Sequence, residues 1–184
     1  MKAMSVGLLG IGTGGGGTYT VLKRNAEEIT RRAGRPIEIT VVADKNLELA
    51  RQVTGGTCRL TDDAFAVVTD PNVDIVIELI GGYGIARELV LKAIENGKHV
   101  VTANKALLAK HGNEIFDAAQ KKGVMVAFEA AVAGGIPIIK ALREGLTANR
   151  IEWIAGIING TTNFILTEMR EKGLSFEVVL KEAQ

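Results

Sequence analysis

The sequence predicts a doubly wound α/β fold with a parallel sheet, followed by the start of a second, smaller α+β domain. Two observations support this prediction. Short apolar or β-branched runs alternate with amphipathic segments of helical length, which is typical of parallel βαβ units with right-handed crossovers. The first apolar run, residues 5–9, ends in a glycine-rich turn that precedes a helix-like segment. We place the first domain at residues 1–134 and the second at residues 135–184.

The remaining strands of the first domain are short runs rich in β-branched or apolar residues, bounded by Gly, Pro, Asn or Asp. The run at 73–80 is almost wholly apolar, as a parallel strand buried on both faces should be. These strands are expected at residues 37–43, 73–80, 99–102 and 124–128.

The intervening helices have apolar residues at helical spacing, polar capping residues at their starts, and Gly or Pro near their ends. Gly112 is expected to interrupt the last of them. The helices are expected at residues 18–32, 47–53, 64–68, 86–96 and 105–121.

The pattern changes after Gly134. We expect a helix at 136–146 beside Pro137, a strand at 151–158, a helix at 161–172 and another from Ser175. The last helix is incomplete at Gln184, so we infer that this domain is unfinished and that the chain is a fragment.

Composition excludes several classes of protein. With 184 residues and 47% hydrophobic residues, the chain can bury a core. A net charge of +1 without runs of like charge argues against nucleic-acid binding, and no apolar stretch reaches the roughly 18 residues of a membrane span. The single cysteine, Cys58, excludes an internal disulfide and a thiolate metal cluster. We therefore expect a cytoplasmic protein.

The glycine turn has the spacing G-x-G-x-x-G at Gly10, Gly12 and Gly15. In a Rossmann fold the first glycine makes the tight turn, the second admits a pyrophosphate, and the third lets helix pack on strand. Free N–H groups and the helix dipole then favour an anion. The turn therefore predicts dinucleotide binding.

Four charged residues follow predicted strands, where ligands bind in such sheets. Asp44 can accept a ribose hydroxyl of NAD or can simply precede a helix, and Lys45 can accommodate the 2′-phosphate of NADP, so the choice of cofactor stays open. Lys105 places a cation in the first turn of a helix, against the dipole, which suggests function. Glu129 can coordinate a cation or hold substrate. It can equally be a carboxylate at the end of a strand whose hydrogen bonds are all made within the protein.

Four motifs in order resemble those of homoserine dehydrogenase, and the resemblance runs through the whole chain. They are Gly7-Leu-Leu-Gly-Ile-Gly-Thr13, Thr102-Ala-Asn-Lys-Ala-Leu-Leu-Ala109, Glu129-Ala-Ala-Val-Ala-Gly-Gly-Ile-Pro137 and Gly156-Ile-Ile-Asn-Gly-Thr-Thr-Asn-Phe-Ile-Leu166. The resemblance implies NAD(P)-linked interconversion of L-homoserine and L-aspartate 4-semialdehyde, on the route to threonine and methionine. It also implies a homo-oligomer.

The resemblance assigns roles to particular residues. Lys105 would contact cofactor and substrate oxygen as the catalytic proton shuttle, and a monovalent cation, Na or K, would be bound mostly by backbone carbonyls. The cofactor residues that the resemblance implies are Gly10, Gly12, Thr13, Gly15, Gly81, Gly82 and Lys105, and we add Gly14 from the same turn and Asp44 from its position after a strand. The implied substrate residues are Asn159, Gly160 and Thr161, and the implied cation residues are Glu129, Val132, Gly134 and Ile136.

The sequence departs from the family at Gly14, where valine is usual, so that four glycines, 14–17, open a helix. Each costs up to about 1 kcal/mol relative to alanine, which predicts a weakened helix start. The family's second catalytic lysine and acidic substrate ligands fall beyond Gln184, so we expect this chain alone to be feebly active. A non-catalytic NAD(P)-binding module and another amino-acid dehydrogenase are the alternatives.

Overall fold

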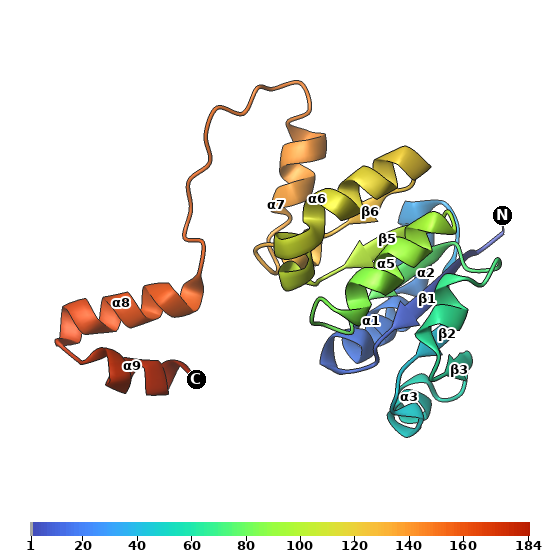
Figure 1. The fold of residues 1–184 in the computed structure, drawn as a ribbon, viewed down its shortest axis with the longest axis horizontal. Helices are drawn as coiled ribbons and strands as arrows, with labels where there is room; N and C mark the ends of the chain where they lie inside the picture. Colours follow the sequence, from blue (N-terminus) through green and yellow to red (C-terminus); the bar gives the residue numbers. More distant parts are fainter. Residues whose placement is uncertain (1) are drawn as a thin grey trace. The chain divides into compact units, whose positions relative to one another are not determined.

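The computed structural model describes residues 2–184, which divide into two compact units, one ending at Ala141 and the other spanning Leu142–Gln184. The described residues of the first unit form a six-stranded parallel sheet in the order β3-β2-β1-β4-β5-β6 (Figure 1). Strand order reverses between β1 and β4, which defines the doubly wound Rossmann fold. The predicted fold class is confirmed, while the predicted domain boundary after residue 134 stays a prediction.

The strands agree with the predicted ones in position but not always in length. The strands found within the predicted ranges 73–80 and 124–128 are shorter than those ranges. The edge strand β3 was not predicted, because its three residues are too few to show an alternation of apolar and polar side chains. The strands are β1 (Met4–Leu9), β2 (Ile37–Ala43), β3 (Arg59–Thr61), β4 (Ile75–Glu78), β5 (His99–Thr102) and β6 (Val126–Ala127).

The helices of the first unit correct two expectations. The single helix predicted at 18–32 is wrong, because the chain breaks at Asn25 into two helices. Gly112 does not interrupt its helix but is buried within it, where tertiary packing outweighs low propensity. The helices are α1 (Thr13–Arg24), α2 (Ala26–Ala33), α3 (Leu47–Thr54), α4 (Ala64–Val68), α5 (Ile85–Glu95), α6 (Lys105–Lys122) and α7 (Ile138–Lys140).

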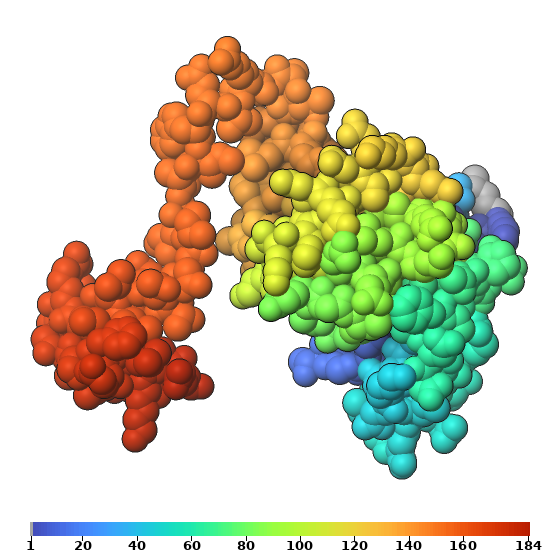
Figure 2. All heavy atoms as spheres, in the orientation of Figure 1, coloured from blue at the N-terminus to red at the C-terminus, as the bar shows by residue number. Residues whose placement is uncertain are grey.

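Two apolar clusters hold the helices on opposite faces of the sheet. On one face, Val67 of α4, Leu89 of α5 and Ile115 of α6 are buried in a common cluster. Helices α5 and α6 also pack on each other, and their atoms form a continuous layer in green to yellow (Figure 2). On the other face, Tyr19 of α1 and Ala50 of α3 belong to a second cluster. The sheet is therefore covered on both faces, with its strand ends left to the loops.

The four consecutive glycines lie inside α1, which begins at Thr13. A Cβ added at Gly14 would meet nothing within 4 Å, so a larger residue fits there. We expect Gly14→Val to raise the free energy of unfolding by about 0.5 kcal/mol, because valine loses less backbone entropy than glycine. Thermal denaturation measures this, and an unchanged or lower melting temperature would contradict it.

The second unit contains α8 (Gly160–Lys172) and α9 (Phe176–Ala183), both of which are predicted from the sequence. The two helices pack on each other. The strand predicted at 151–158 is wrong: these residues are irregular, and Trp153 and Ile158 are 78% and 90% exposed. A strand needs a neighbour to pair with its backbone, and the part of the chain described here offers none.

The helix predicted at 136–146 is also wrong in form. The α-helical part is limited to α7, and Ala141–Gly145 continues it as a π-helix. None of these residues is buried, so no packing selects the α-helical ladder for the whole segment. Across residues 2–184, no helix is long and apolar enough to cross a membrane.

Candidate functional site

The glycine turn after β1 has a shape that only glycine permits. Gly10 has φ +90°, and a Cβ there would lie 2.8 Å from the carbonyl oxygen of Leu79 at the end of β4. A Cβ at Gly15 would lie 1.9 Å from the carbonyl oxygen of Gly10. The first glycine therefore turns the chain beside β4, and the third lets α1 pack against the turn, as the motif predicts.

Gly12 differs from these two glycines because there is free space where a side chain would be. It is the N-terminal capping residue of α1, and a Cβ there would meet nothing within 4 Å. The first turn of α1 carries no acidic residue that would repel an anion. Exposed backbone next to the positive end of a helix is a suitable site for a pyrophosphate.

A cavity of about 610 Å³ lies next to this turn, at the carboxyl ends of β1, β2 and β4. Its volume is in the usual range for small-molecule sites. One part of its lining is polar, and α4, α5 and the end of β4 supply an apolar wall. The lining residues are Gly10, Gly12, Ala43, Asp44, Lys45, Asp62, Asp63, Ala64, Phe65, Leu79, Ile80, Ile85 and Leu89.

Asp44 connects the end of β2 to the glycine turn. Its Oδ2 accepts a hydrogen bond from the N–H of Ile11 at 2.7 Å, and its Oδ1 accepts one from the N–H of Asn46 at 2.7 Å. The carboxylate thus orders the loop, and Asp44 also lines the cavity, while its role as acceptor for a ribose hydroxyl stays a prediction. Lys45 also lines the cavity, and its Nζ donates to the carbonyl oxygen of Asp62 at 2.9 Å.

Gly81, Gly82 and Lys105 come from two neighbouring strand ends. The two glycines follow β4 with φ +83° and +67°, and Lys105 is the exposed first residue of α6, after β5. Strands β4 and β5 pair with each other, and the Nδ2 of Asn104 donates to the carbonyl oxygen of Gly82. The structure therefore brings these predicted residues to one edge of the sheet, next to the strand end that lines the cavity.

Glu129 uses its carboxylate on the protein itself. Its Oε1 and Oε2 accept hydrogen bonds from the N–H groups of Ile139 and Lys140, each at 2.9 Å, which caps α7. Because both oxygens of Glu129 already accept hydrogen bonds from the backbone, the arrangement favours a structural role for this carboxylate over direct coordination of a cation. Within residues 2–184, no group of three or more His, Cys, Asp or Glu side chains could hold a metal ion.

The predicted substrate residues lie at the start of α8. Asn159 caps this helix, with its Oδ1 accepting from the N–H and the hydroxyl of Thr162 at 2.8 and 2.9 Å. Gly160 and Thr161 form the exposed first turn. Their part in a substrate pocket stays a prediction.

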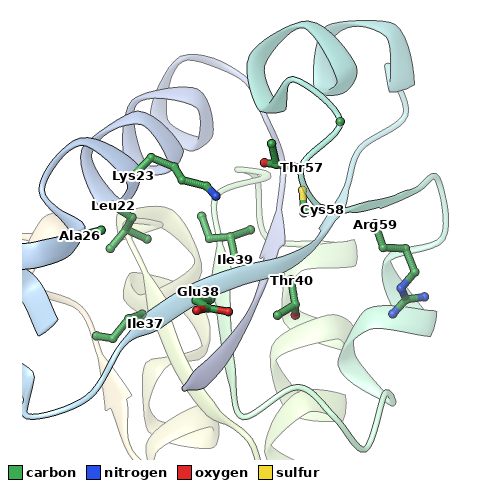
Figure 3. Close-up of a pocket in the computed structure, with 11 residues that line it drawn as sticks. Leu22, Lys23, Ala26, Ile37, Glu38, Ile39, Thr40, Thr57, Cys58 and Arg59 are labelled. Atoms are coloured by element: carbon green, nitrogen blue, oxygen red, sulfur yellow. The ribbon is translucent and has the colours of Figure 1, made fainter. Parts of the chain in front are cut away.

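Another cavity, of about 600 Å³, lies between α1, β2 and the segment leading to β3 (Figure 3). It is lined by residues 37–40 from the first half of β2, away from the carboxyl ends where ligands bind in such sheets. Figure 3 shows Lys23 directed toward the segment that carries Thr57 and Cys58. Burial raises the pKa of the Cys58 thiol, which disfavours the reactive thiolate. We assign no chemistry to this cavity.

Sequence reasoning missed the groups that connect the site residues, above all Glu78 and Thr102. Both are buried at paired strand ends, and the Thr102 hydroxyl donates to Glu78 Oε2 at 2.7 Å. One signal was available, since Glu78 is a carboxylate near the end of a run that is otherwise almost wholly apolar.

Comparison with known proteins is consistent with this geometry. Residues 10–129 match the NAD-binding domain of homoserine dehydrogenase, and residues 137–184 match the homoserine dehydrogenase domain. Homoserine dehydrogenases from Methylobacillus glycogenes and Pseudomonas aeruginosa are 70% and 66% identical over the whole chain, which covers 45% and 42% of their lengths. A homoserine dehydrogenase structure from Thiobacillus denitrificans is 72% identical with a TM-score of 0.91, over 100% of this chain and 42% of that one.

The chain thus spans less than half the length of the relatives it matches. The matched NAD-binding domain covers the glycine turn, the cavity and the start of α6. A match over this much of the chain, together with the Rossmann topology, shows that the chain belongs to the homoserine dehydrogenase family.

Proposed function

We propose that this chain is the dinucleotide-binding part of an NAD(P)-dependent homoserine dehydrogenase, which interconverts L-homoserine and L-aspartate 4-semialdehyde. The observation that carries the proposal is the glycine turn, where Gly10 and Gly15 are sterically required and Gly12 is open toward the cavity. Family membership supports the substrate, because the chain itself holds only part of the enzyme.

A bound NAD(P) would supply the hydride that reduces the semialdehyde, or take up the hydride lost by homoserine. The N–H groups at the start of α1 would hold its pyrophosphate, and Gly81 and Gly82 would border its nicotinamide. Lys105 holds a proton at the substrate oxygen and donates it when the semialdehyde is reduced, or accepts it when homoserine is oxidised. The exposed position of Lys105 at a strand's carboxyl end supports this role.

Within the cavity, charge favours NAD over NADP. Three carboxylates, those of Asp44, Asp62 and Asp63, belong to its lining, against one ammonium group, that of Lys45. The 2′-phosphate of NADP adds negative charge that this excess of carboxylates repels, whereas the hydroxyl of NAD can donate to a carboxylate. We therefore propose NAD as the preferred cofactor.

A monovalent cation and a homo-oligomer complete the proposal. The segment at 132–136 turns sharply, with positive φ at Ala133 and Gly135, and backbone carbonyls are oxygen ligands that hard cations accept. We propose the cation at this turn, bound by the carbonyls of Val132 and Gly134, with Glu129 shaping the turn through α7. The exposed apolar residues at 151–158 support the homo-oligomer, because apolar surface of this kind is typical of a contact with another copy of the protein.

Calorimetric titration of the chain with NAD and with NADP tests the dinucleotide site. We expect Gly12→Val to weaken binding at least about tenfold, because a branched side chain would occupy the space of the pyrophosphate. The fold should persist, since a Cβ at Gly12 meets nothing within 4 Å. Gly17→Val, also in open space on α1 but outside the cavity lining, is the matched control and should bind as the wild type does.

Equal affinity of the Gly12→Val and wild-type chains would contradict the pyrophosphate assignment. Tighter binding of NADP than of NAD would contradict the proposed preference and leave the site itself intact.

A further inference from the structure

A buried carboxylate organises the end of β4. The Glu78 side chain has 0% exposure, and its Oε1 accepts hydrogen bonds from the N–H groups of Ile80 at 2.9 Å and Gly81 at 3.2 Å. Its Oε2 accepts from the Thr102 hydroxyl at 2.7 Å. One side chain therefore fixes the loop that leads to Gly81 and also links it to the end of β5.

From Thr102 the network continues to the start of α6. The Thr102 oxygen accepts from the N–H of Asn104 at 2.9 Å, and Asn104 Oδ1 accepts from the N–H of Leu107 at 3.0 Å, which caps the helix. Asn104 Nδ2 returns to the carbonyl oxygen of Gly82. The network of hydrogen bonds thus returns to the loop that contains Gly81 and Gly82. Lys105, the first residue of α6, directly follows Asn104 and is therefore held beside this network.

Packing alone gives no reason for a carboxylate at this position. Taking a charged group out of water is costly unless hydrogen bonds compensate, and the neighbouring β4 residue Val76 shows that an apolar side chain suits this strand. The partners of Glu78 are two backbone N–H groups on the loop that follows β4 and the hydroxyl of Thr102, the last residue of β5. A fully satisfied buried network of this kind specifies one arrangement of the groups it joins.

We propose that Glu78 is a positioning residue for the reaction, acting through Thr102 and Asn104. It holds the Gly81–Gly82 loop and the first turn of α6 in one fixed relation, so that the nicotinamide and the Lys105 ammonium group meet the substrate together. This inference rests on the proposed function, because it takes Lys105 and the glycine loop as parts of its site.

Steady-state kinetics of the full-length enzyme containing this chain test the proposal. In Glu78→Gln an NH2 group replaces one acceptor oxygen, so either the two backbone N–H groups of Ile80 and Gly81 or the Thr102 hydroxyl lose their acceptor. We expect kcat to fall on the order of 10²-fold, because small misplacements of reacting groups have effects of this size. KM for homoserine should change little, since the predicted substrate residues Asn159–Thr161 are outside the network.

Thr102 provides a pair of variants that keep the test decisive if Glu78→Gln does not fold. Thr102→Val keeps the branched shape favoured in a strand but removes the bridging hydroxyl, and it should lose kcat as Glu78→Gln does. Thr102→Ser keeps the hydroxyl and should retain a kcat close to that of the wild type.

Lys98→Met is the control for a purely structural effect. Lys98 is 3% exposed at the amino end of β5, and its Nζ donates to the carbonyl oxygens of Val73, at 2.8 Å, and Asp70. Its loss should lower the melting temperature and leave kcat unchanged.

The same measurements separate this inference from the proposed function. Absence of wild-type turnover of homoserine with either cofactor would overturn the proposed function. With wild-type turnover present, a normal kcat in Thr102→Val, or an equal loss in Thr102→Ser and Lys98→Met, would overturn the positioning role.

Discussion

Gly15→Ala is expected to lower the free energy of unfolding by about 3 kcal/mol, at the upper end of the usual range for overpacking. The added Cβ would lie 1.9 Å from the carbonyl oxygen of Gly10, a backbone atom that cannot rotate away. Either α1 moves off the sheet or the turn opens, and both displace the N–H groups proposed to bind the pyrophosphate. Dinucleotide affinity should therefore fall together with stability.

Chemical denaturation and calorimetric titration measure the two effects. Gly17→Ala is the matched control, because it makes the same substitution in the same helix where the Cβ meets nothing within 4 Å. It should stabilise the chain by about 1 kcal/mol, the difference in helix propensity between the two residues. Similar stabilities of the two variants would show that α1 does not pack against the turn as described.

Lys105→Ala is expected to reduce the kcat of the full-length enzyme by a factor on the order of 10² to 10⁴, the usual contribution of a general acid or base. The lysine is exposed at the start of α6, so its loss creates no core cavity and should leave the melting temperature unchanged. Steady-state kinetics with homoserine and with semialdehyde measure the effect in both directions.

The control for Lys105→Ala is Lys110→Ala on the same helix. The Nζ of Lys110 lies 4.1 Å from the centre of the Tyr83 ring, and the residue has no proposed role in the reaction. It should keep wild-type turnover. A Lys105→Ala enzyme with wild-type kcat would exclude this lysine as the proton shuttle.

The candidate site was predictable where its signal is local. The spacing of Gly10, Gly12 and Gly15 is set by the backbone path of one turn, so it can be interpreted without knowing what packs nearby. The position of Lys105 followed in the same way, from a short strand and a helix start adjacent in sequence. Glu78 and Thr102 were missed because their 24-residue separation in sequence becomes a contact only when β4 pairs with β5.

The sequence by itself determined the alternation of strands and helices in the first unit, the Rossmann class and the position of the glycine turn, because periodicity, glycine spacing and capping residues act over a few residues. Tertiary structure decided the rest. The continuity of α6 through the buried Gly112 and the edge strand β3, which pairs with β2, depend on neighbours distant in sequence. The apolar run at 151–158 shows the same dependence, because these residues can form a strand only where another strand pairs with their backbone, and no strand within residues 2–184 does so.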